Sequence, residues 1–121
     1  MNTVDLVVVF LNAIGIVTSH RSGATGFVPG VLITRGKLLF DRDISHVGDL
    51  LHEAGHLAVV PSQFRHLFND DVDHGVELMF NQCRHLNPDD PLLVNVMQAS
   101  ECEATAWSWA AGVSIRLLQH S

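Results

Sequence analysis

The chain has 121 residues, 47% of them hydrophobic and 17% charged, which suits one globular domain spanning residues 1–121. Its formal net charge is −6, and only seven residues are Lys or Arg, so we expect no nucleic-acid partner, because phosphate binding needs clustered cations. The two cysteines form no Cys-x-x-Cys pattern, which favours reduced thiols and a cytoplasmic protein.

The N-terminal segment predicts a buried helix that begins with Thr3 as its N-cap and stops at Gly15. The apolar stretch Leu6–Val17 is too short to span a membrane, and Asn12 and Gly15 interrupt it, so we expect no membrane partner. A short strand is predicted at Ile16–Val17.

Val31–Asp41 predicts a β-hairpin whose turn lies at Arg35-Gly36-Lys37. A helical apolar pattern follows, with Ser45 as its expected N-cap and Pro61 after its end. A small sheet beside this helix would form one wall of a cleft, and the sheet edge could accept an extended peptide by strand addition.

The helix after the hairpin contains His52-Glu53-Ala54-Gly55-His56, a His-Glu-x-x-His motif. Residues four apart share a helix face, so His52 and His56 can bind one Zn²⁺ from the same side. Glu53 lies about 100° round the helix from His52, beside the metal, where it can take a proton from water activated by zinc. The competing interpretation is a pair of core histidines that happen to lie one turn apart.

The C-terminal half predicts further helices. Val72–His85 has a helical apolar pattern, and Pro91 is typical of a first helical position. From there a helical pattern runs to about Leu118, with a break expected near Ser100.

A catalytic zinc site usually has three protein ligands and water, so a third ligand must come from elsewhere in the chain. Val59 and Ser62 occupy the positions of the extended His-x-x-Gly-x-x-His pattern, which leaves Glu101 or Glu103 as the best candidates. Glu101 is preferred because it shares a face with small residues that let two helices approach: Ala104, Thr105, Ser108 and Gly112. Glu103 shares a face with Ala106, Trp107 and Ala110, which suggests core packing.

The remaining candidate is His74, which could be a further ligand or could stabilise a developing oxyanion. The nearby acids Asp70, Asp71 and Asp73 lack the order of a Ca²⁺-binding loop, so we interpret them as solvated surface.

With these parts in place, the chain resembles a minimal zincin of the gluzincin type, similar to the small metallopeptidase-like domains of the ImmA/IrrE group. The resemblance rests on the hairpin Val31–Asp41, the motif helix Asp49–Val59 and a later segment that begins at Glu101. This segment is similar to a pattern found in the later helix of that group, Glu-x-x-Ala-Asn-x-Phe-Ala. Here Thr105 stands at the Asn position and Trp107 at the Phe position. The resemblance implies an α+β, zincin-like fold, mostly helical, with Glu101 as the third ligand.

The expected function is that of a zinc-dependent metallopeptidase-like hydrolase, which cuts a peptide or protein substrate with Glu53 as general base. The alternative is a non-hydrolytic zinc-binding sensor or protein-interaction domain on the same fold. A third hypothesis is a structural zinc site closed by a fourth protein ligand such as His74.

Overall fold

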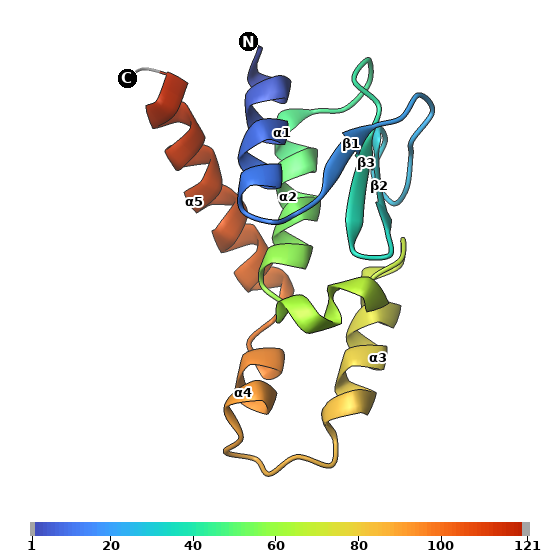
Figure 1. Ribbon diagram of the computed structural model, residues 1–121, viewed down its shortest axis with the longest axis vertical. Helices are drawn as coiled ribbons and strands as arrows, with labels where there is room; N and C mark the ends of the chain where they lie inside the picture. Colours follow the sequence, from blue (N-terminus) through green and yellow to red (C-terminus); the bar gives the residue numbers. More distant parts are fainter. Residues whose placement is uncertain (1, 120–121) are drawn as a thin grey trace.

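The computed structural model describes residues 2–119 and shows an α+β protein in which helices dominate and one small mixed sheet lies to the side (Figure 1). In Figure 1, α1 and α2 lie between the sheet and α5, and α3 and α4 lie below them. The elements in chain order are α1 (Thr3–Ala13), β1 (Thr18–His20), β2 (Val31–Thr34), β3 (Lys37–Phe40), α2 (Val47–Ala58), the 3-10 helix η1 (Ser62–Leu67), α3 (Val72–Cys83), α4 (Pro91–Met97) and α5 (Glu101–Gln119).

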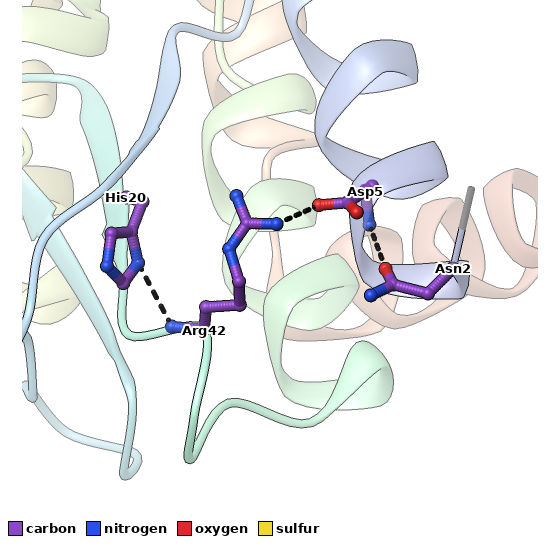
Figure 2. A network of polar contacts seen from close by, with 4 residues as sticks. All are labelled: Asn2, Asp5, His20 and Arg42. Carbon is purple, nitrogen blue, oxygen red and sulfur yellow. Dashed lines mark hydrogen bonds and ion pairs between the residues drawn. The ribbon is translucent and has the colours of Figure 1, made fainter.

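The N-terminal helix has a different cap from the predicted one, because Asn2 and not Thr3 is the N-cap of α1. The Oδ1 of Asn2 accepts a hydrogen bond from the N–H of Asp5 at 2.8 Å, which satisfies a donor of the first turn. Figure 2 shows that Asp5 also forms an ion pair with Arg42, whose backbone N–H donates to Nδ1 of His20 at 3.2 Å. These contacts connect the start of α1 with β1 and with the loop after β3.

The strand predicted at Ile16–Val17 was placed too early, since β1 is Thr18–His20. The Asn12 side chain explains the position of the strand. It accepts from the N–H of Thr18 at 3.0 Å and donates to the C=O of Thr18 at 2.9 Å, so the end of α1 fixes the start of β1. Ile16 is buried in the core instead.

The hairpin predicted at Val31–Asp41 is confirmed, with β2 antiparallel to β3 from Val31↔Phe40 to Thr34↔Lys37. Its turn residues Arg35 and Gly36 both have positive φ, 49° and 78°, as tight hairpins require. β1 pairs in parallel with the other edge of β3, which gives the strand order β1-β3-β2.

The motif helix α2 packs against α1, α5, η1 and the sheet, and its residues Leu50, Ala54 and Leu57 have no exposed surface. The predicted N-cap was wrong. His46 holds that position, and the buried Oγ of Ser45 has no hydrogen-bond partner among the described residues. Val59 follows the last helical residue, so α2 ends before Pro61, as expected.

The C-terminal helices follow the prediction closely. α3 ends two residues before the predicted His85, and α4 begins at Pro91, with the Asp90 carboxylate accepting from the N–H of Leu92 at 2.9 Å. The break predicted near Ser100 separates α4 from α5. Within the described residues, the helices include none with the length and apolar character needed to cross a membrane.

The backbones of α2 and α5 approach each other closely at Gly55. A Cβ placed on Gly55 would lie only 2.5 Å from the carbonyl oxygen of Ala104. Ala104 itself is fully buried at this contact. The missing side chain of Gly55 therefore lets the backbones of α2 and α5 touch, as small residues at a helix crossing do.

Asp41 fixes the loop 21–30 to the end of β3. Its Oδ2 accepts from the N–H of Gly23 at 2.9 Å, and its Oδ1 accepts from the N–H of Asp43 at 3.0 Å. These two bonds, the one from Gly23 most of all, hold the pKa of Asp41 below its usual range.

The contact at Gly55 predicts the effect of adding one methyl group. Gly55→Ala should lower the free energy of unfolding by about 1–3 kcal/mol, because the new methyl group would collide with the backbone of α5. Gly48→Ala in the same helix is the matched control, since no atom lies within 4 Å of its added Cβ, and it should be neutral or stabilising. Urea unfolding would measure both. Equal stability of the two variants would contradict the tight contact.

Asp41→Asn should destabilise the fold at neutral pH, because an amide offers only one acceptor to two N–H donors. Because the folded-state pKa lies below the unfolded value of about 3.9, the contribution of the carboxylate is complete above that value and is lost as the pH falls through the folded-state pKa. The stability difference between parent and variant should therefore narrow below about pH 4 in urea titrations. Asp43→Asn, at an exposed position, is the control. A difference independent of pH would contradict this account.

Candidate metal centre

Three side chains of the motif lie together on α2. The potential ligand atoms of His52, Glu53 and His56 all lie within 4.8 Å of one another. His56 and Glu53 are buried, with 8% and 6% of their surface exposed, whereas a third of the His52 side chain is exposed. The helix therefore presents two imidazoles on one face and a buried carboxylate beside them, as the i, i+4 spacing predicts.

Glu101 reaches the same two imidazoles from the first turn of α5. Its Oε1 lies 2.8 Å from Nε2 of His52, and its Oε2 lies 3.3 Å from Nε2 of His56. The Glu101 side chain is 66% exposed, so it closes the histidine pair from the solvent side. Both histidines thus direct Nε2 toward a single carboxylate, although that carboxylate lies about 50 positions further along the chain.

The helix contact at Gly55 explains how Glu101 arrives there. Ala104, which touches Gly55, lies one turn after Glu101, and Gly55 lies between His52 and His56. The close contact of α2 and α5 therefore lies within one helical turn of every member of the polar cluster formed by His52, Glu53, His56 and Glu101. A bulkier pair at this crossing would hold the backbones further apart and move the carboxylate away from the imidazoles.

Glu103, the alternative ligand, lies away from the cluster. Its backbone N–H donates to Oγ of Ser100 at 3.2 Å, the bond of a helix N-cap, and its side chain is exposed. The face predicted to pack in the core is only partly buried. Trp107 contacts Phe10 with ring centroids 6.5 Å apart, but Ala106 and Ala110 are exposed. The structure brings Glu101, and not Glu103, to the two histidines.

Burial is the main cause that raises the pKa of Glu53 above its usual range. His52 opposes this shift, and the negative charges of Glu101, Asp49 and Asp70 add to it. A carboxylate whose pKa is raised holds a proton more readily, which is the property a general base requires near neutral pH.

Burial also lowers the pKa of His56, and neighbouring His52 acts in the same direction, while Glu101 and Asp73 oppose it. His56 is therefore favoured in its neutral form, the form in which an imidazole binds a metal.

The cluster opens into a cleft of about 680 Å³, within the usual size range of ligand sites. Besides the cluster, the cleft is lined by the loop segment 26–28 and by residues 70–73. Phe27 is 92% exposed at this cleft. Asp70 and Asp73 are solvent-exposed as predicted, yet they also line the cleft and act electrostatically on Glu53 and His56 respectively.

The sequence could not place these cleft residues, because loop 21–30 and residues 70–73 are far apart in the chain and are each held by a hydrogen bond to strand β2. The N–H of Asp70 donates to the C=O of Ile33 at 2.8 Å, and the N–H of Gly26 donates to the C=O of Val31 at 2.9 Å. The one available sequence signal was the run of acids just before α3.

The same hydrogen bonds decide how the sheet edge can be used. Because the carbonyls of Val31 and Ile33 already accept bonds from Gly26 and Asp70, the outer edge of β2 is partly covered. A peptide strand added along the outer edge of β2 would find these two acceptors taken, and the strand addition expected from the sequence, which named no edge, stays a prediction.

His74 does not join the cluster. It lies exposed in the first turn of α3, where its backbone N–H donates to the capping carboxylate of Asp71 at 3.3 Å. It is not among the residues that line the cleft, whereas its neighbour Asp73 is.

The donor set of His52, His56 and Glu101 fits a zinc ion chemically. Two imidazole nitrogens and one carboxylate oxygen are borderline ligands that suit Zn²⁺, and a site with three such residues leaves a coordination position for water or substrate. Comparison of the chain with protein-family models, with curated proteins and with solved structures found no significant match.

The two glutamates near the start of α5 give a direct test of the ligand set. Glu101→Gln should weaken Zn²⁺ binding by at least about 100-fold, since the loss of an outer-shell partner alone costs about 10–100-fold. Glu103→Gln is the matched control on the same helix turn and should bind zinc as the parent does. Competition with a chromophoric chelator would measure both affinities. An equal loss of zinc affinity in both variants, or a loss of zinc affinity only in Glu103→Gln, would show that Glu101 is not a ligand.

Proposed function

We propose that the chain is a zinc-dependent metallopeptidase-like hydrolase on a minimal zincin-like fold, and that it cuts peptide bonds in a peptide or protein substrate. His52, His56 and Glu101 would hold Zn²⁺, and Glu53 would act as general base. The observation that carries the proposal is the position of the Glu101 carboxylate, whose two oxygens lie 2.8 and 3.3 Å from the Nε2 atoms of the two motif histidines.

The cleft supports an open rather than a purely structural site. A structural zinc site is closed by four protein ligands, whereas here the two histidines and Glu101 line a cleft of about 680 Å³. His74, the side chain considered as a closing ligand, is not among the residues that line it.

The residues of the site divide the chemistry between them. When bound, Zn²⁺ supplies a Lewis acid that polarises a carbonyl and lowers the pKa of water to about 7. Glu53, buried beside the histidines with a raised pKa, accepts the proton of the attacking water and passes it to the leaving amine. Buried His56 stays neutral and keeps its nitrogen lone pair available.

The cluster on α2 alone also contains three potential donors, so Glu53 could itself be a ligand. The base role is favoured for Glu53 because Glu101 already supplies a carboxylate to both imidazoles. The two roles predict opposite effects of Glu53→Gln on metal content.

We further propose that the protein works in the cytoplasm with peptides or proteins as partners. Both cysteines are free thiols, Cys83 buried and Cys102 exposed, which agrees with a reducing compartment.

Glu53→Gln should retain zinc but reduce kcat/KM for peptide hydrolysis by at least about 100-fold, because general base catalysis contributes about 10²–10⁴-fold. Peptide-library cleavage and metal analysis of the same preparation would give both values. Glu77→Gln, an exposed position on α3 outside the cleft, is the matched control and should cleave as the parent does.

Each departure from this result has a separate meaning. Cleavage by Glu53→Gln at the parent rate would remove Glu53 as the base. Loss of zinc in Glu53→Gln would make it a ligand. A zinc-loaded parent that cleaves nothing would favour the non-hydrolytic sensor or interaction domain.

A further inference from the structure

A second cavity, of about 650 Å³, lies between α1, α2 and α5. Its lining is mainly apolar and includes Val7 on α1, Val47 and Leu51 on α2, and Trp109, Val113 and Ile115 on α5. Its volume lies within the usual size range of ligand sites.

The outer wall of this cavity exposes large apolar side chains to water. Trp109 is 74% exposed and Val113 is 55% exposed. Covering this surface with another apolar group would be favourable by about 25 cal/mol per Å² of apolar area removed from water. The chemistry of the lining therefore selects an apolar occupant.

The cavity meets the metal-site cleft at His52, which lines both. At this junction Thr105 also lines the cavity, one helical turn after Glu101, with an exposed side chain. A ligand that contacts His52 in the cleft therefore lies beside a residue that also lines the apolar cavity.

We propose that this cavity is the specificity pocket of the proposed hydrolase and binds a bulky apolar side chain, such as Leu or Phe, next to the peptide bond placed at the metal centre. The inference rests on the proposed function, because the occupant is a side chain of the same substrate. It assigns Leu51, Trp109 and Gly112 as specificity-determining residues.

Gly112 offers a way to fill the pocket without disturbing the helix. It lines the cavity, and a Cβ added to it would meet only the Cδ1 of Leu51, at an ordinary distance of 3.7 Å. Gly112→Leu should therefore fold normally and occupy the space meant for the substrate side chain. Ser114→Leu adds the same group at an exposed position of α5 that does not line the cavity, so it is the matched control.

The test measures binding separately from cleavage. In the Glu53→Gln, Trp107→Phe background, Trp109 is the only tryptophan, so its emission reports on the pocket. The probes are blocked alanine pentapeptides with Phe, Leu, Ala or Glu at the centre. We expect a saturable blue shift of Trp109 emission, with Phe and Leu peptides binding at least about tenfold more tightly than the Ala peptide. Gly112→Leu should abolish this tenfold preference, and Ser114→Leu should keep it.

Several results would contradict the proposed role of the cavity as a specificity pocket. They are equal binding of all four peptides, no binding of any peptide, or an unchanged preference in Gly112→Leu. A shift that depends on protein concentration and not on peptide would assign the Trp109 surface to a second copy of the chain, and would overturn the proposal as well. Failure of the proposed function is a different result, namely absence of Glu53-dependent cleavage in a peptide library while Leu and Phe peptides still bind.

Discussion

The contact between the backbone of α2 at Gly55 and the backbone of α5 at Ala104 controls the rest of the site. No side chain separates the two helices at this point, so the start of α5 lies against the middle of the motif helix. Glu101 lies one turn before the contact, and the two histidines lie on either side of Gly55. The distances of 2.8 and 3.3 Å between the Glu101 carboxylate and the imidazoles follow from this approach. The small residues at this helix crossing thus let the two helices approach closely enough for their polar side chains to meet.

The cluster combines groups in different environments, and burial explains their different properties. Glu53 and His56 are buried, and desolvation disfavours the charged form of each, so the pKa of Glu53 is raised and that of His56 is lowered. Glu101 is mostly exposed and meets the histidines from outside. Under the proposed function, these environments suit a base, a neutral ligand and an anionic ligand respectively.

The walls around the cluster depend on hydrogen bonds between distant segments. Asp41 holds loop 21–30 through Gly23, and Asp70 bonds to Ile33, so the two sides of the cleft are both tied to the hairpin. On the other side of His52, the apolar cavity is bounded by α1 and α5. His52 thus lines both an acidic cleft and an apolar cavity. Under the proposed function, the two surfaces would bind different parts of one substrate.

The sequence by itself determined the hairpin, the motif helix, the start of α4 at Pro91, the break near Ser100 and the shared face of His52 and His56. These features depend on turn residues, local periodicity and spacing within one helix. Such signals lie within short segments of the sequence and do not depend on the rest of the fold. It also ranked Glu101 above Glu103 from the small residues on the Glu101 face. It misplaced β1, whose start is fixed by the Asn12 side chain, and it misplaced two N-caps. Asn2 caps α1 in place of Thr3, and His46 holds the N-cap position of α2 in place of Ser45 without a side-chain hydrogen bond.

Only the tertiary structure decided which carboxylate meets the histidines and where His74 lies. It alone brought Asp70, Asp73 and Phe27 to the cleft and opened an apolar cavity at its other end. These features join segments that are far apart in the chain. Their positions depend on how closely α2 and α5 approach and on hydrogen bonds between loops, and neither leaves a periodic signal in the sequence.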